Sequence, residues 1–300
     1  MDKELENQLD LLAKKALHAL ASINRPDIAI DCAKQMLSLE PNFFLAYSIL
    51  AEAYTEKGLI NQSIDAARQW LKLEPNNPKA SWRYGAALYA KGYYTGADSY
   101  FKNAVQSLPN EDRLLFAYGM NKFKLRNFEL ARKYIIKAIE LNPMEPDYFN
   151  GLGLFYLEIK QYDDAERNLL KAIELDPDNS IYIGDYGAFL FHTKRLKDAL
   201  LFSQRALAAD PENPVLKYNY ILSLKANHPI FNFFLWQDHW KRTKILWLIW
   251  CVLLLLGLFF IELPVILKVL IFIIGVIALP YLLIILLDRI AAREPRKKKI

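Results

Sequence analysis

The sequence has few of the residues from which catalytic and metal sites are usually built. It has only two cysteines and four histidines among 300 residues, and no glycine-rich phosphate loop. The histidines are scattered without metal-ligand spacing: His18, His192, His228 and His239. The many carboxylates fall in turns or on polar helix faces. We therefore expect no enzymatic activity, no cofactor and no bound metal.

The two cysteines also give no sign of a disulfide framework. Cys32 lies in an amphipathic stretch and Cys251 in an apolar run, so they are not expected to pair. Two lone cysteines are consistent with a reducing compartment. Residues 1–6 contain no apolar segment of the kind that secretory signal peptides have. The bulk of the chain is therefore expected in the cytosol.

Positive charge is lacking in most of the chain. The net charge is +5, but residues 228–300 alone contribute +6, so residues 1–227 carry −1. A nucleic-acid-binding domain needs a basic stripe on its folded part. This distribution argues against nucleic acid as a partner.

A proline returns every 34 residues without insertion or deletion. The copies are Pro41, Pro75, Pro109, Pro143, Pro177 and Pro211. A fixed period of this size indicates an array of stacked two-helix units, and proline ends the second helix because it offers no N–H and clashes with the preceding turn. The period predicts six units: 10–43, 44–77, 78–111, 112–145, 146–179 and 180–213.

Three positions in these units favour small side chains, which let two antiparallel helices approach closely. In units three to six, position 8 is glycine and positions 20 and 27 are alanine. Leu17, Met36 and Trp70 depart from this pattern in the first two units. The small residues are Gly85, Gly119, Gly153, Gly187, Ala97, Ala131, Ala165, Ala199, Ala104, Ala138, Ala172 and Ala206.

The repeat resembles the tetratricopeptide repeat (TPR) family over residues 10–213. Residues 148–156, 162–165 and 171–177 match the family's first helix, second helix and closing proline most closely. The resemblance implies an all-α, right-handed superhelical solenoid of six helix-turn-helix units. Residues 1–9 are a lead-in, and the amphipathic residues 214–227 are predicted to form a capping helix.

In the family, positions 2, 5, 6, 9, 12 and 13 of each unit line a concave groove. Aromatic residues interleaved with cations would suit an extended peptide with apolar and acidic side chains. An alternative for about half of these aromatics is packing between units. The resemblance implies these partner-binding residues: Lys79, Trp82, Arg83, Tyr89, Arg113, Phe116, Met120, Phe123 and Phe191.

Some family members hold the C-terminal carboxylate of chaperones with five residues. Lys14, Lys79 and Arg83 stand at matching positions, but His18 and Ile49 replace the family's asparagines. Chaperone docking is therefore a minor alternative.

The sequence changes character after residue 227. Residues 245–261 and 269–287 are almost free of charge and, at about 1.5 Å per residue, are long enough to cross a bilayer. Glu262 and Lys268 flank the intervening turn, which predicts a two-helix transmembrane hairpin over 245–287. Aromatic and basic residues precede it in 228–244 and a basic tail follows in 288–300, so both termini are predicted in the cytosol. The membrane-interface residues are Trp236, Trp240, Lys241, Arg242, Lys244, Arg289 and Arg293.

These features favour a membrane-anchored adaptor that presents a cytosolic TPR groove to a protein or peptide. The alternative is a regulatory or assembly subunit of a membrane enzyme or transporter complex, with specific contacts made by the hairpin. The expected location is an integral membrane protein of a bacterial inner membrane or a eukaryotic endomembrane. The terminal Lys297-Lys298-Lys299-Ile300 resembles a dilysine retrieval signal, although charge anchoring explains it as well.

Overall fold

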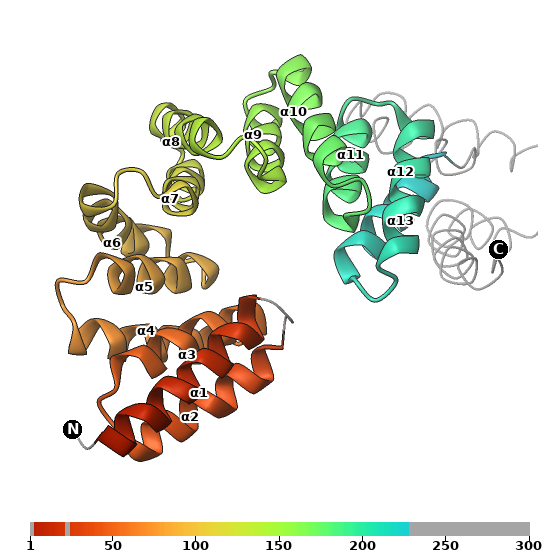
Figure 1. Cartoon of the computed structure of the whole chain (residues 1–300). Coiled ribbons are helices and arrows are strands. Elements are labelled where there is room, and N and C mark those ends of the chain that lie inside the picture. The colour runs from red at the N-terminus through yellow and green to blue at the C-terminus, as the bar shows by residue number, and fades with distance from the viewer. Residues whose placement is uncertain (1–2, 22–24, 228–300) are drawn as a thin grey trace, which may run out of the picture. The chain divides into compact units, whose positions relative to one another are not determined.

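The computed structural model describes residues 3–21 and 25–227, and every regular element within these ranges is an α-helix (Figure 1). The expected all-α solenoid of helix pairs is therefore confirmed for this part of the chain. The helices are α1 (Lys3–Ala21), α2 (Pro26–Leu39), α3 (Phe44–Glu56), α4 (Ile60–Leu73), α5 (Pro78–Ala90), α6 (Tyr94–Ser107), α7 (Asp112–Lys124), α8 (Phe128–Leu141), α9 (Pro146–Glu158), α10 (Tyr162–Leu175), α11 (Ser180–His192), α12 (Leu196–Ala209) and α13 (Pro214–Asn227).

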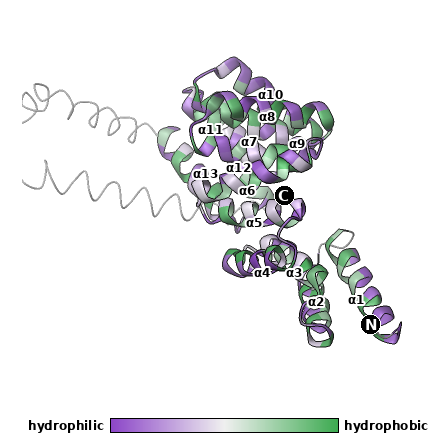
Figure 2. Cartoon of the chain, turned by 90° about the vertical axis from the view of Figure 1, so that its left-hand side faces the viewer, coloured by the Kyte–Doolittle hydropathy of each residue, from purple (hydrophilic) through white to green (hydrophobic). Residues whose placement is uncertain are grey.

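The helices recur with the period of the prolines. Helices α3, α5, α7, α9, α11 and α13 begin at residues 44, 78, 112, 146, 180 and 214, which are 34 residues apart. The helices carry hydrophilic and hydrophobic residues side by side (Figure 2). In α8 the buried residues Ala131, Ile135 and Ala138 form one stripe, because residues three and four apart share a helix face. Helix α1 already includes most of the predicted lead-in, and its Leu9 is buried.

The small residues allow the close helix approach that the sequence predicted. A Cβ added to Gly119 in α7 would lie 2.8 Å from Cγ1 of Ile135 and 3.1 Å from the carbonyl oxygen of Ala131 in α8. Two large residues at position 27 are also buried, Met36 and Trp70. The Trp70 indole donates a 2.8 Å hydrogen bond to the carboxylate of Glu74.

The turn inside each of the last five 34-residue repeats has one residue with positive φ. Gly58 and Gly92 fill this place with φ of 69° and 87°, and Arg126, Lys160 and Lys194 adopt 57°, 62° and 65° at the equivalent positions. Glycine takes this conformation at no steric cost, whereas the longer residues are held in it by the helices on either side.

Three of the turns between repeats are fixed by an asparagine. Asn77 Nδ2 donates to Glu74 Oε2 at 2.8 Å, and its Oδ1 accepts from the backbone N–H of Lys79 at 2.9 Å. This side chain therefore caps the free N–H groups at the start of α5. Asn179 and Asn213 repeat the arrangement before α11 and α13.

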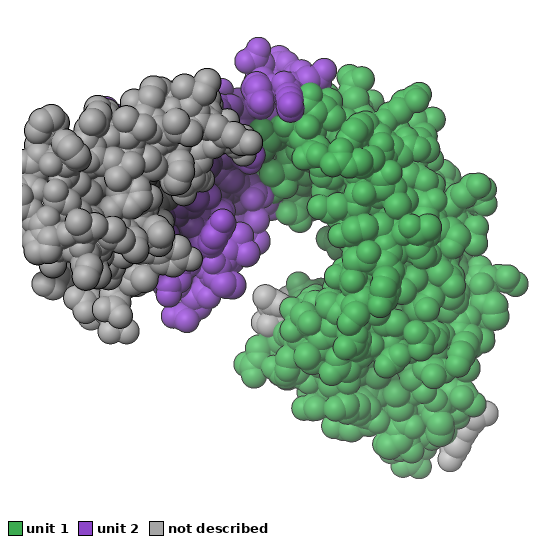
Figure 3. Space-filling model, turned by 180° about the vertical axis from the view of Figure 1, so that it is seen from behind, with its two compact units in different colours: residues 1–159 green, residues 160–300 purple. Residues whose placement is uncertain are grey.

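The chain also divides into two compact parts, which are larger than the 34-residue repeats and are coloured separately in Figure 3. They are called unit 1 (residues 1–159) and unit 2 (residues 160–300). Unit 1 contains α1 to α9, and the described part of unit 2 contains α10 to α13. The right-handed superhelix over the whole array stays a prediction.

A buried ion pair joins α6 to α7 in unit 1. The Lys122 ammonium lies 2.7 Å from Asp98, which also accepts from Nδ2 of Asn121 at 3.2 Å. The ammonium also lies 5.0 Å from the ring centroid of Tyr118. Burial alone would lower the pKa of Lys122, but the hydrogen bonds to Asp98 and Tyr118 raise it above its ordinary value.

A comparable but more exposed pair joins α10 to α11 and α12 in unit 2. Glu166 accepts from the Tyr186 hydroxyl at 2.7 Å and from Arg195 at 2.6 Å. Burial alone would raise the pKa of Glu166, but these two donors hold it below its ordinary value.

Candidate partner-binding cleft

Helices α3, α4, α5 and α7 of unit 1 line a cleft of about 460 Å³. It brings together four residues that the sequence predicted, Lys79, Trp82, Arg83 and Arg113. Spacings of three and four residues place Lys79, Trp82 and Arg83 on one side of α5. The cleft is lined by Phe44, Leu45, Ser48, Glu52, Trp70, Asn77, Lys79, Trp82, Arg83, Glu111 and Arg113.

Arg83 is already paired inside the protein. Its guanidinium donates to Glu52 Oε1 of α3 at 2.7 Å and lies 5.0 Å from the ring centroid of Trp82. Ion pairing and the cation–π contact hold the guanidinium over the indole. Arg83 therefore fixes Trp82, and its charge is largely balanced by Glu52.

A second carboxylate lies close to this pair. Burial and the negative charge of Glu52 raise the pKa of Glu56, and Arg83 only partly opposes them. Helix α3 therefore carries two neighbouring carboxylates, of which only Glu52 lines the cleft.

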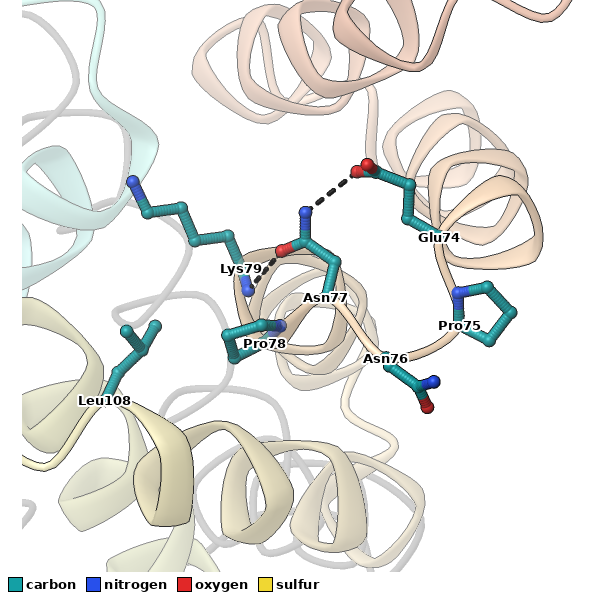
Figure 4. Close-up of a pocket in the computed structure, with 7 residues that line it drawn as sticks. All are labelled: Glu74, Pro75, Asn76, Asn77, Pro78, Lys79 and Leu108. Carbon is teal, nitrogen blue, oxygen red and sulfur yellow. Dashed lines mark hydrogen bonds between the residues drawn. The ribbon is translucent and has the colours of Figure 1, made fainter.

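Helices α5 and α7 provide two cations of the lining that remain open to a ligand. Lys79 and Arg113 are exposed, and neither forms an ion pair with the described residues. The Lys79 side chain extends away from the Glu74 and Asn77 pair that supports its backbone (Figure 4). The turn in Figure 4 borders a second, more open hollow of about 620 Å³, which shares Lys79 with the cleft. Two cations therefore face a ligand without competition from a carboxylate bonded to them.

Three other predicted residues of unit 1 pack between repeats. Phe116 lies 4.7 Å, centroid to centroid, from Tyr148, and its ring together with the sulfur of Met120 covers Gly151. A Cβ at Gly151 would come within 2.6 Å of Phe116. Their partner-binding role stays a prediction, but much of their surface is already used in joining α7 to α9.

Phe123 shows the same behaviour at the other end of α7. Its ring lies 5.8 Å from that of Phe155 and 6.2 Å from that of Phe128, centroid to centroid. Such aromatic contacts stabilise packing beyond the area that they bury.

Tyr89 and Phe191 lie outside the cleft. Tyr89 is half-buried beside Tyr94, and burial raises the pKa of its hydroxyl to about 12. Phe191 is a partly buried residue of α11 in unit 2.

The chaperone clamp has little support in this geometry. Ile49, at a position where the clamp has asparagine, is only 1% exposed. Arg83, which would grip the carboxylate, is bound to Glu52.

Three lining residues were not predicted from the sequence: Glu52, Trp70 and Glu111. Glu52 stands at a groove position of the family pattern, but the prediction favoured aromatic and cationic residues. Trp70 belongs to a second helix, whose side chains the pattern places in the core. A large residue where small ones are typical was the available signal.

The comparisons with known proteins support the resemblance. A family model described as tetratricopeptide repeat matches residues 116–180 and 156–214, which is about a third of the chain and does not reach the cleft. No curated protein matches the sequence significantly.

Three solved structures share the fold. A crystal structure of PilW, described as a widely conserved type IV pilus biogenesis factor, aligns with a TM-score of 0.59 and 18% identity over 73% of this chain and 99% of that chain. PilF of Pseudomonas aeruginosa aligns with a TM-score of 0.57 and 17% identity over 75% of this chain and 100% of that chain. The anaphase-promoting complex assembly Cut9–Hcn1 aligns with a TM-score of 0.61 and 19% identity over 73% of this chain and 46% of that chain. These identities establish the helical repeat fold alone.

Among the described helices, none has the length and apolar character needed to cross a membrane. Within the same residues, no group of three or more His, Cys, Asp or Glu side chains could hold a metal ion. The predicted hairpin and the interface residues from Trp236 to Arg293 lie outside the described residues.

Proposed function

We propose that the chain is a membrane-anchored adaptor whose cleft binds an extended acidic peptide segment of a partner protein. The observation that carries the proposal is that Lys79 and Arg113 line the same cleft as the indole of Trp82 and form no ion pair within residues 3–21 and 25–227. An apolar side chain of the peptide would lie against Trp82, Phe44 and Leu45. A peptide carboxylate would meet Lys79 and Arg113, because charge-assisted hydrogen bonds are the stronger ones.

The adaptor role follows from what the cleft contains. The lining residues supply apolar surface, one internal ion pair and two cations open to a ligand, which is the chemistry of a binding surface. Proteins of this repeat class act through such surfaces, and the chemistry belongs to the partner.

The membrane part of the proposal depends on sequence. Residues 245–261 and 269–287 have the length and composition of two spans with basic flanks. Cysteines placed at Lys3 and Lys299 of the full chain should react with an impermeant reagent only from the cytosolic side. Labelling of either end from the opposite side would contradict the hairpin.

Peptide selection tests the cleft. The full-length protein would be used to enrich peptides from a random displayed library, and the enriched sequences should carry carboxylates next to apolar residues. The double variant Lys79→Glu/Arg113→Glu should lose at least about tenfold in affinity for them, or about 1.4 kcal/mol.

Lys102→Glu/Lys133→Glu is the matched control, because it changes the net charge by the same amount and both lysines are exposed, on α6 and α8 of the same unit, and do not line the cleft. Equal losses from the cleft variant and from this control would show that only net charge matters. Enrichment of peptides without carboxylates would also reject the proposal.

Exchange of residues 245–287 for an unrelated hairpin of the same orientation tests whether they serve only as an anchor. We expect peptide binding and partner capture to survive the exchange, because generic apolar burial depends on length and hydrophobicity. Loss of the partner with intact insertion would favour the membrane-subunit alternative.

A further inference from the structure

The turn that follows α6 differs from the other turns between repeats in its first residue. Leu108 follows α6, whereas a polar residue follows each of the other second helices, α2, α4, α8, α10 and α12: Glu40, Glu74, Asn142, Asp176 and Asp210. Each of these polar side chains forms a hydrogen bond within its own turn. A leucine cannot form such a bond, so this turn has an apolar side chain in place of a stabilising contact.

Leu108 lines the hollow of about 620 Å³ at the turn before α5, which we call the turn hollow. Pro75 and Pro78 line it as well, so much of its surface is apolar and rigid. Leu108 is half-buried and packs against the same cluster of buried residues as Trp82 of the cleft. The turn hollow and the cleft therefore rest on one part of the core of unit 1.

The two hollows also share a polar border. Asn77 and Lys79 line both of them. Lys79 is exposed and forms no ion pair within residues 3–21 and 25–227. Glu74 brings a carboxylate to the turn hollow, but its Oε2 already accepts from Trp70 and Asn77, both at 2.8 Å. A ligand that passes from the cleft into the turn hollow therefore meets a free cation at the border.

Asn76 adds a side-chain amide to the turn hollow. It is exposed, and it forms no hydrogen bond with the described residues. Figure 4 shows its side chain directed away from the bonded pair of Glu74 and Asn77. A carboxamide has both a donor and an acceptor, which match the C=O and N–H groups of an extended peptide. The turn hollow thus offers apolar surface together with a partner for a peptide backbone.

We propose that the turn hollow is a second apolar subsite for the acidic peptide that the cleft binds. The inference rests on the proposed function of the cleft. The peptide carboxylate lies at Lys79, one apolar side chain lies against Trp82, and another, on the far side of the carboxylate, lies against Leu108. The protein therefore selects peptides in which apolar residues flank the acidic residue on both sides, and it discriminates against other acidic peptides.

Leu108→Asn in the full-length protein tests the subsite. The change gives this turn the residue that follows α8, Asn142, so the fold should tolerate it. The probe is the most enriched peptide of the displayed library, made synthetically, together with two derivatives. Each derivative has serine in place of the apolar residue on one side of the carboxylate. Isothermal titration calorimetry gives the affinity of each peptide.

The wild-type protein should bind both derivatives at least about tenfold more weakly than the parent peptide, because each derivative loses one buried apolar side chain. Leu108→Asn should weaken the parent by a similar factor and leave one derivative as it was, so the preference is lost on one side only. The control is Leu141→Asn, because Leu141 is 43% exposed at the end of α8 and lines neither hollow. It should keep both preferences.

Equal weakening of all three peptides by Leu108→Asn, or no weakening of any, would overturn the subsite. The cleft proposal would still stand if Lys79→Glu/Arg113→Glu weakened the same peptides. If no acidic peptide binds, both proposals fail. Self-association of the full-length protein that Leu108→Asn abolishes and the peptide does not inhibit would assign the turn hollow to a second copy instead.

Asn76→Ala tests the backbone contact separately. It should weaken the parent and both derivatives by the same factor of about five, which is the usual effect of one hydrogen bond, because the contact does not depend on the peptide side chains. Asn110→Ala is the matched control, since Asn110 is the equivalent exposed asparagine of the next turn and lines neither hollow. Equal effects of the two variants would contradict the contact at Asn76.

Discussion

Units 1 and 2 use the same 34-residue frame but present different surfaces. In unit 1 the groove positions of α5 and α7 place Lys79, Trp82 and Arg113 around one cleft. In unit 2 the corresponding face is largely apolar, with Ile181 of α11 and Val215 of α13 exposed. The frame thus fixes which positions are buried, and it leaves the groove positions free to differ. Binding chemistry can therefore change along the chain without a change of fold.

The largest difference between the units should appear at position 24 of the second helices. Phe101 of α6 in unit 1 and Leu169 of α10 in unit 2 are fully buried there, whereas α12 of unit 2 has Ser203, which is bonded to Ser223. Phe101→Ala should lower the free energy of unfolding by about 3–5 kcal/mol, because it removes a large ring and leaves a cavity. Ser203→Ala should cost about 1 kcal/mol, the usual value of one hydrogen bond. Thermal unfolding followed by circular dichroism gives both values, and equal losses would contradict the comparison.

A smaller difference is expected between the two ion pairs. The Lys122 and Asp98 side chains are 11% and 26% exposed, whereas those of Arg195 and Glu166 are 45% and 31% exposed. Removing one partner of a buried pair leaves an uncompensated charge, so Lys122→Ala should cost about 2 kcal/mol or more. Arg195→Ala should cost less than about 1 kcal/mol.

Double-mutant cycles with Asp98→Ala and Glu166→Ala would isolate the two pair energies. A coupling energy for Arg195 and Glu166 as large as that for Lys122 and Asp98 would show that solvent screening does not make the two ion pairs differ in strength.

The sequence predicts the fold well, because one residue type decides each boundary. Pro75 and Pro177 stop the second helices, and Gly119 marks a close approach that a single Cβ would block. These are local and steric effects, so a single chain reveals them. The positive φ of Arg126 was not predicted, because nothing in an arginine signals a left-handed turn.

The candidate site was only partly predictable. A groove position tells which way a side chain points, but it cannot tell whether the next repeat covers that side chain. Phe116 and Trp82 hold the same position, yet Phe116 rests on Gly151 while Trp82 lines the cleft. Likewise, the pairing of Arg83 with Glu52 depends on a distance across 31 residues that no local pattern contains.

The smallest expected effect concerns the melting temperature, which replacement of two glutamates by glutamine should shift in opposite directions. The pKa of Glu56 in unit 1 is raised by burial and by Glu52, so its ionisation destabilises the fold. The pKa of Glu166 in unit 2 is lowered by Tyr186 and Arg195, which outweigh its burial, so its ionisation stabilises the fold. At pH 7 Glu56→Gln should therefore slightly raise the melting temperature, and Glu166→Gln should lower it.

The pH dependence follows from the same signs. The contribution of Glu166 is present above its ordinary pKa of 4.5 and is lost as the pH falls through its lower folded value. The penalty at Glu56 develops as the pH rises from 4.5 through its raised folded value, so it vanishes in acid. Both variants should then approach the wild-type melting temperature as the pH falls below 4.5. Shifts of the same sign at pH 7, or shifts that persist unchanged in acid, would show that the amide replacements act through packing rather than through charge.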